Sequence, residues 1–424
     1  MGQTMVEKLF SKKNKLGTPV MAGDIVEARI DGMMHNYSFH TVIEQAIKAG
    51  FTDGLPKVFD KDKVFILNDH HQPALSQALA DRSVMMRREC ERLGITTYVE
   101  EPGIAHQWMI DYGYVRPGEL VLGNDSHTTG YGCLNAASTC ISKADAFYAL
   151  VFGEMWFEVP RSIKVTLDGH YPNYPISKDI LLTLAGKYGD DFGAGMSIEY
   201  TGPLIPQMPI DSRMCIATQG VDVAATFSMF PCDGKTRAWL ESRTDVPYEP
   251  LTADADATYE KEIYLNVDEM PFVVAKPHTL GNVCPVDEVR GVKIQQAQIG
   301  SCANGRYEDI EIAARMLKGR KVAKGVRFIV SPASQPVYLQ CMETGVAQAI
   351  VAAGGQFITP GCGICQPKVG YMSAGETCIT ATTRNYRGRK GSLDANLYLG
   401  GPLTVVAAAV AGEIVNPREV FREL

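Results

Sequence analysis

The sequence lacks an apolar run long enough to cross a membrane, and its basic N-terminal segment, MGQTMVEKLFSKKNKLG, lacks the apolar core of a signal peptide. We therefore expect a cytoplasmic protein with no membrane association. It also lacks an excess of positive charge, since the formal net charge is -7. No global field gathers nucleic acid, so no nucleic-acid partner is expected, and an anionic ligand must be bound by local arginines.

Two further patterns are missing. Neither a glycine-rich dinucleotide fingerprint nor a P-loop lysine motif occurs. Eleven cysteines, an odd number, are scattered through 424 residues, so a disulfide framework is not expected. Metal binding, catalysis or burial remain as explanations for the cysteines. Four that lie in apolar or helical patterns are expected in the core: Cys90, Cys140, Cys215 and Cys341.

Short apolar runs alternate with amphipathic helical patterns, which predicts an α/β fold with parallel strands. Loop-rich stretches suggest three α/β domains: 1–161, 162–285 and 286–424. The expected strands are 63–67, 96–100, 119–123, 297–300, 325–330 and 356–358. The expected helices include one that stops at Gly94, one over 307–318 and one over 334–353.

Polar clusters follow several of these strands directly. They are NDHH at 68–71, NDSHTTGYG at 124–132, SCANGR at 301–306 and TPGCGIC at 359–365. Because the carboxyl ends of parallel strands form the ligand crevice of α/β sheets, these clusters are candidates for one shared site. His106 lies on a less regular segment.

Three cysteines have the spacing of metal ligands. Cys362 and Cys365 lie in a tight glycine loop, and Cys302 lies in a second glycine loop about sixty residues upstream. Three thiolates can hold three corners of a 4Fe-4S cluster and leave one iron open as a Lewis acid. The alternatives are a zinc site with a fourth His or Cys ligand, a redox pair, or simple burial.

Histidines beside aspartates indicate proton transfer, because a carboxylate fixes the imidazole tautomer and raises its basicity. Asp69 precedes His70, and Asp125 lies two residues before His127, although such aspartates can also be helix caps. In TTRNYRGRKGS, Arg384 and Arg389 have the spacing of a bidentate clamp on carboxylates. A solvated basic loop is the alternative.

Four motifs occur along the chain in the following order: GNDSHTTGYG, GSCANGRYEDIEIAARML, GCGIC and TTRNYRGRKGS. Together they resemble the aconitase superfamily, especially the large subunits of 3-isopropylmalate dehydratases. Supporting matches run from GDIVEARID through VPRSIKVTLDGH and SKDI to the tail LTVVAAAVAGEI, so the resemblance covers almost the whole chain.

The resemblance implies three α/β domains packed around a 4Fe-4S cluster, without the family's swivelling fourth domain. Its implied cluster ligands are Cys302, Cys362 and Cys365. Its implied catalytic residues are Asp69, His70, His106, Asp125, His127 and Asp222. Its implied substrate-binding residues are Ser126, Arg384 and Arg389.

The implied activity is that of a hydro-lyase that dehydrates and rehydrates a hydroxy di- or tricarboxylic acid, of the 3-isopropylmalate and 2-isopropylmalate type. The chain ends at Leu424, so we expect a separate small subunit to supply the swivelling domain and its serine base. The alternatives are a paralogue acting on homoaconitate, dimethylmalate, citramalate or maleate, a regulatory RNA-binding relative, or an inactive scaffold subunit.

Several positions depart from the family's common pattern. Asn36 is followed by Tyr37 where the family usually has an Asp after a His or Asn. Thr218 and Asp222 replace the usual Asn and Glu, and Thr383 replaces the Asn before the first clamp arginine. These departures concern the surroundings of the cluster and the substrate pocket, so they bear more on the substrate than on hydro-lyase chemistry.

Overall fold

The structure, a computed structural model, describes residues 2–366 and 368–422. The chain forms two compact units, each built from segments that are distant in sequence. Unit 1 comprises Met1–Thr166, Gly193–Gly202 and Ala225–Tyr264. Unit 2 comprises Leu167–Phe192, Pro203–Ala224 and Leu265–Leu424. The division into domains at 162 and 286 remains a prediction.

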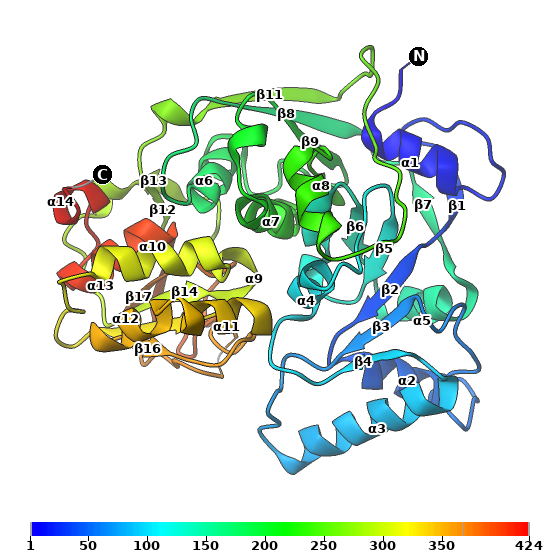
Figure 1. The fold of residues 1–424 in the computed structure, drawn as a ribbon, viewed down its shortest axis with the longest axis horizontal. Coiled ribbons are helices and arrows are strands. Elements are labelled where there is room, and N and C mark those ends of the chain that lie inside the picture. Colours follow the sequence, from blue (N-terminus) through cyan, green and yellow to red (C-terminus); the bar gives the residue numbers. More distant parts are fainter. Residues whose placement is uncertain (1, 367, 423–424) are drawn as a thin grey trace. The chain divides into compact units, whose positions relative to one another are not determined.

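A five-stranded parallel sheet is the centre of unit 1 (Figure 1). Its strands, in spatial order, are β4 (Thr97–Val99), β3 (Val64–Leu67), β2 (Gly32–His35), β5 (Leu120–Gly123) and β6 (Ala137–Cys140). The chain starts in the middle at β2, adds β3 and β4 on one side, and then adds β5 and β6 on the other. The strand order therefore reverses between β2 and β5, and ligands of open parallel sheets bind at such a reversal.

Helices cover this sheet and complete the core of unit 1. Phe39, Val42 and Met86 pack with Val64 and Ile66, whose side chains share one face because strand residues alternate. The helices are α1 (Met5–Lys13), α2 (Phe39–Lys48), α3 (Gln77–Leu93), α4 (Ala105–Asp111), α5 (Lys143–Phe152) and α8 (Gly234–Glu241). Helix α3 ends as predicted, because Gly94 adopts the left-handed conformation and caps it.

Two smaller sheets accompany the first. β1 (Ile25–Arg29) pairs antiparallel with β7 (Glu154–Glu158). The second sheet has the order β10 (Phe227–Met229), β9 (Ser197–Thr201), β8 (Ser162–Asp168) and β11 (Lys261–Asn266).

Unit 2 is built on a seven-stranded mixed sheet. Its strands, in spatial order, are β13 (Val283–Pro285), β12 (Val273–Ala275), β18 (Asn396–Gly400), β17 (Thr377–Thr380), β14 (Gln296–Gly300), β15 (Arg327–Ser331) and β16 (Gln356–Phe357). The run from β18 to β16 is parallel. The chain leaves β14 toward β15 and β16 and then returns to β17, so the strand order reverses between β14 and β17.

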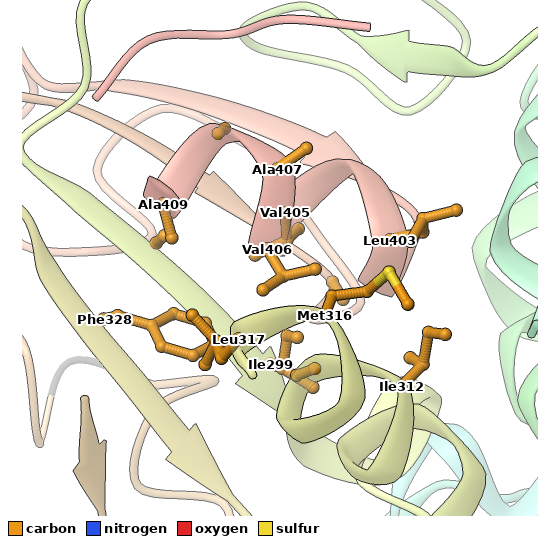
Figure 2. Close-up of a cluster of buried hydrophobic side chains, with 14 of the residues drawn as sticks. Ile299, Ile312, Met316, Leu317, Phe328, Leu403, Val405, Val406, Ala407 and Ala409 are labelled. Carbon is orange, nitrogen blue, oxygen red and sulfur yellow. The ribbon is translucent and has the colours of Figure 1, made fainter. Parts of the chain in front are cut away.

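Apolar helices bury one face of that sheet. Figure 2 shows Leu403, Val405 and Val406 of α13 (Pro402–Ala411) beside Met316 and Leu317 of α10 (Tyr307–Leu317). The apolar tail of the sequence is thus core. The other helices of unit 2 are α6 (Ser177–Tyr188), α7 (Ile210–Thr218), α9 (Ser301–Asn304), α11 (Gln335–Glu343), α12 (Val346–Ala352) and α14 (Pro417–Val420).

The predicted α/β class with parallel strands is confirmed, and two local expectations are wrong. The helix expected over 334–353 is two helices, α11 and α12, because Gly345 between them has φ +76° and breaks the run. Cys140, expected in the core, is exposed at the end of β6. Among residues 2–366 and 368–422, no helix is both long and apolar enough to span a bilayer.

Candidate functional site

The histidines and aspartates predicted in unit 1 lie together at the carboxyl edge of its sheet. Asp69 and His70 follow β3, Asp125 and His127 follow β5, and His106 lies in the first turn of α4. The side chains of all five residues are almost fully buried. The sequence-predicted clusters after β3 and β5 therefore converge within this unit.

Asp69 fixes the orientation of its neighbour. Its Oδ1 lies 2.6 Å from Nδ1 of His70, and its Oδ2 accepts a hydrogen bond of 2.9 Å from the backbone N–H of Ala105, at the start of α4. The short contact places the Nδ1 proton of His70 toward the carboxylate. Nε2 of His70 is then the atom that gains or loses a proton.

Asp125 is the centre of the set. Its carboxylate oxygens lie 3.7 Å from Nε2 of His70, 3.6 Å from Nδ1 of His106 and 3.9 Å from Nδ1 of His127. Burial opposes ionisation of Asp125, but the charges of His106, His70 and His127 and the N–H of His127 outweigh it and hold its pKa well below the usual value. The surrounding imidazoles thus favour the carboxylate form of Asp125.

Three neighbours complete the unit 1 set. Nδ2 of Asn36, which follows β2, donates to Oδ2 of Asp125 at 3.0 Å across the point where the strand order reverses. The ring of Tyr37 lies 4.5 Å from that of His70 and 4.7 Å from that of His71, between ring centroids. Ser126 Oγ lies 3.3 Å from Nδ1 of His127. Sequence reasoning noted Asn36 and Tyr37 only as departures, because β2 was not predicted.

The three predicted metal ligands all lie in unit 2. Cys302 is in α9, directly after β14, while Cys362 and Cys365 lie in the turns after β16. All three are buried and free of disulfides. Their sequence-predicted position after strands is thus confirmed, and their role as ligands stays a prediction.

Gly300, just before Cys302, lies against the side chain of Ile364 in the other cysteine loop. Gly300 has φ +148°, and a Cβ on it would lie 2.4 Å from the carbonyl oxygen of Ser331 and 2.6 Å from Cδ1 of Ile364, the residue between Cys362 and Cys365. Ser301, next along the chain, takes the left-handed φ of +70°, which is rare for a residue with a side chain. Strain of this kind concentrates at functional sites.

Cations surround the Cys365 sulfur. Nη2 of Arg389 donates to Sγ at 2.9 Å, Thr383 Oγ1 lies 3.3 Å from Sγ, and Lys390 Nζ donates to the carbonyl of Ile364. Burial raises the pKa of the Cys365 thiol, but the charges of Arg389 and Lys390 outweigh it and the net shift is downward. Cys365 is thereby prepared to act as a thiolate.

Cys215 provides the contrast in the same unit. Burial raises its pKa to about 12, and its Sγ donates to Asn304 Oδ1 at 3.5 Å. Cys215 therefore stays a thiol.

The two predicted clamp arginines have partners of their own. Nε of Arg384 donates to Oδ1 of Asp222 at 2.5 Å, and Nη1 of Arg389 donates to the hydroxyl of Tyr386 at 2.8 Å. Asp222, predicted as catalytic, is thus in contact with Arg384. The side chain of Arg384 is 31% exposed, so its guanidinium is accessible as well as anchored.

Two buried polar residues were missed by sequence reasoning. Lys178, in the first turn of α6, donates to Oε1 of Gln219 at 2.6 Å and to the carbonyl of Thr382 at 3.0 Å. Nε2 of Gln219 donates in turn to the carbonyl of Thr383 at 3.4 Å. From the sequence, Lys178 was considered only as part of the supporting match SKDI and was assigned no role.

The donor set of unit 2 fits an iron–sulfur cluster better than zinc. A three-cysteine zinc site needs a fourth ligand. The two histidines of this unit, His170 and His278, are both exposed, while the three cysteines are buried. Buried thiols beside cationic side chains suit a cluster that carries net negative charge.

Comparisons with known proteins identify the family of this chain. The model of the Aconitase family (aconitate hydratase) matches residues 33–291 and 287–412. The chain belongs to the aconitase family. Among its relatives, the 3-isopropylmalate dehydratase large subunit 1 of Methanopyrus kandleri is 37% identical over 421 residues, 99% of each chain. The 3-isopropylmalate dehydratase large subunit 2 of Archaeoglobus fulgidus is 39% identical over 422 residues, 99% of this chain and 100% of that relative.

Solved structures show the fold again. The crystal structure of Thermococcus kodakaraensis aconitase X in its holo-form matches 92% of this chain and 93% of its own, with a TM-score of 0.52 and 12% sequence identity. The family model and the two relatives confirm the family membership predicted from four motifs. The roles of the individual site residues stay predictions.

Proposed function

We propose that this member of the aconitase family is the large catalytic subunit of a 4Fe-4S hydro-lyase that interconverts 3-isopropylmalate and 2-isopropylmalate in the cytoplasm. One observation carries the proposal. A chain similar over 99% of its length to 3-isopropylmalate dehydratase large subunits holds three buried cysteines outside any disulfide, and the sulfur of one accepts a hydrogen bond from Arg389. Dehydration of a hydroxy acid needs an acid for the leaving hydroxyl, a base for the carbon-bound proton, and anchors for the carboxylates.

In unit 2, Cys302, Cys362 and Cys365 would hold the cluster, which when bound supplies a Lewis-acidic iron that polarises the substrate hydroxyl and a carboxylate. Arg384 and Arg389 would bind the remote carboxylate through their planar forks. Asp222 holds Arg384 in orientation through the Nε contact and leaves the outer edge of the guanidinium for substrate. Because the three cysteines are buried, the surrounding protein limits the access of water to them.

In unit 1, His70 would carry the proton to the departing hydroxyl. Asp69 holds the Nδ1 proton of His70, so Nε2 is the atom that delivers the proton. Asp125 stabilises the cationic imidazole that exists before delivery, and His106 and His127 share that carboxylate. Ser126 would contact the substrate beside His127.

The relatives are named large subunits, and we propose a separate small subunit as the partner of this chain too. It would contribute the base that takes the carbon-bound proton. The reaction then draws on residues of two chains, and the large subunit alone should bind its cluster yet turn over no substrate.

The decisive experiment is anaerobic purification with iron and sulfide analysis and a visible spectrum. Wild type should carry about four irons and four sulfides with a broad visible band. Cys365→Ser should lose the band, whereas Cys378→Ser, a matched control that removes a buried cysteine of β17, should keep it. One zinc per chain, or a spectrum unchanged in Cys365→Ser, would contradict the cluster.

The substrate is tested separately. The loaded chain, combined with a small subunit, should turn over 3-isopropylmalate with a higher kcat/KM than the alternative substrates, where dimethylmalate and citramalate would be dehydrated, and homoaconitate and maleate would be hydrated. A higher kcat/KM on one of these four would replace the substrate and keep the reaction class. No turnover on any of them, with an intact cluster, would favour the scaffold alternative.

A further inference from the structure

Lys178 occupies a costly position. Its side chain is fully buried, and it lies in the first turn of α6, where the partial positive charge of the helix N-terminus disfavours a cation. Burial lowers the pKa of Lys178, and the negative charge of Asp222 opposes that shift. Within residues 2–366 and 368–422, the hydrogen bonds of Lys178 go to an amide oxygen and a backbone carbonyl, and these bonds must offset the high cost of desolvating an ammonium.

The bonds of Lys178 tie together segments that are distant in sequence. Nζ reaches Gln219 Oε1 at 2.6 Å and the carbonyl of Thr382 at 3.0 Å. Gln219 begins the short helix η3 (Gln219–Val223), which also carries Asp222. One ammonium therefore links η3 to the segment after β17.

That segment carries the contacts on which the proposed site depends. Thr383 Oγ1 lies 3.3 Å from the Cys365 sulfur, and Arg384 Nε donates to Asp222 at 2.5 Å. Gln219 Nε2 adds a bond of 3.4 Å to the carbonyl of Thr383. Lys178 and Gln219 hold the backbone on one side, and Asp222 holds the guanidinium on the other.

We propose that Lys178 is a positioning residue that locks the Thr382–Arg384 segment to η3 through Gln219 and so sets both the Arg384 clamp and the Thr383 contact with Cys365. The effect on substrate rests on the proposed function, whereas the locking of the segment does not. Without Lys178 the segment loses its bond at Thr382, and Arg384 keeps only Asp222 to orient it.

The first test uses the full chain without metal. In hydrogen–deuterium exchange read by mass spectrometry, Lys178→Met should speed amide exchange in the peptide that spans 382–384 by about tenfold, since bonds from charged donors contribute that much or more. Gln219→Leu removes one part of the link and should give a smaller increase in the same peptide. Unchanged exchange in both variants would overturn the proposal.

Arg213→Met is the matched control. Arg213 is also a fully buried cation of unit 2, but it lies in α7 and its Nη2 donates to the carbonyl of Ile205 at 2.8 Å. It should lower thermal stability without affecting exchange at 382–384. An equal acceleration in this control would mean that any lost buried cation loosens the segment, and the proposal would fail.

The second test uses the loaded enzyme with its small subunit. Lys178→Met and Gln219→Leu should raise KM about tenfold with a smaller change in kcat, and chelators should bleach the visible cluster band faster than in wild type. If wild type takes up no cluster, the proposed function fails while the exchange result still decides the locking. If wild type loads and both variants keep its KM and bleaching rate, the clamp effect of Lys178 is wrong.

Discussion

The two units use the same arrangement of strands for different chemistry. In unit 1 the strand order reverses between β2 and β5, where Asn36 meets Asp125. In unit 2 it reverses between β14 and β17, whose carboxyl ends lead to Cys302 and to Arg384. Ligands of open parallel sheets bind at reversals of this kind. The side chains at each reversal determine which chemistry it supports.

The side chains at the two reversals differ in charge. In unit 1 two carboxylates lie close to three imidazoles, so the positive charge of a protonated imidazole is balanced by a neighbouring carboxylate. In unit 2, Arg384 contacts Asp222, while Arg389 donates to the Cys365 sulfur and Lys390 to the carbonyl of Ile364. Cationic side chains beside a thiol favour its thiolate form and the binding of anions. Unit 1 is therefore suited to proton transfer, and unit 2 to holding anions.

Removing the central charge of unit 1 is expected to give the largest effect. Asp125→Asn keeps the hydrogen bond from Asn36 but leaves His70, His106 and His127 without their common carboxylate. We expect kcat to fall about 10²- to 10⁴-fold. Measured iron and sulfide should be unchanged, because the cluster ligands belong to unit 2. Loss of the cluster in this variant would contradict the division of roles, because it would show that the residues of unit 1 also affect cluster binding.

The corresponding change in unit 2 is Arg389→Lys. A point charge cannot reproduce the fork that donates to Cys365 and Tyr386, so KM should rise about 30- to 100-fold. Arg387→Lys is the control, since Arg387 lies in the same loop, is exposed and pairs with Asp394 at 3.4 Å. Steady-state kinetics check both. Equal KM values in the two variants would remove Arg389 from the clamp.

How far the sequence predicts these two sets depends on whether a contact is local. Asp69 with His70, and Cys302 after β14, follow from the rule that polar residues after a parallel strand lie at its ligand edge. The contact of Asn36 with Asp125 joins residues 89 positions apart, and that of Lys178 with Thr382 joins residues 204 apart. No local pattern encodes such contacts, since packing of whole elements decides them.

Stability should depend on pH through a buried acid in each unit. Burial raises the pKa of Asp179 in unit 2 to about 7, and that of Glu199 in unit 1 to about 7. The folded chain then keeps a proton that the unfolded chain releases above about pH 4, so the free energy of unfolding falls as pH rises from about 4 to 7 and levels off above that.

Asp179→Asn and Glu199→Gln should each flatten this dependence by a few degrees of melting temperature, measured by calorimetry across that pH range. A slope unchanged in both acid variants would show that neither acid is protonated in the folded chain.

The smallest effect concerns Tyr37. Its ring contacts both His70 and His71, and aromatic pairs of this kind contribute about 0.5 to 1.5 kcal/mol. Tyr37→Leu should therefore lower kcat only severalfold and shift the acidic limb of the pH–rate profile, because the His70 ring loses a neighbour that fixes it. Tyr37→Phe, which keeps the ring, should behave as wild type. A loss as large as that of Asp125→Asn would mean that Tyr37 itself touches substrate.

Gly300 has a consequence for anyone who wishes to redesign this protein. Because Gly300 has no side chain, it packs against Ile364, and the two cysteine loops are therefore in contact. A side chain at 300 would press on the carbonyl oxygen of Ser331, at the end of β15, and on the end of the Ile364 side chain. An engineer who wants another metal here cannot edit one loop at a time: position 300 and position 364 must be chosen together, as a single combinatorial variable.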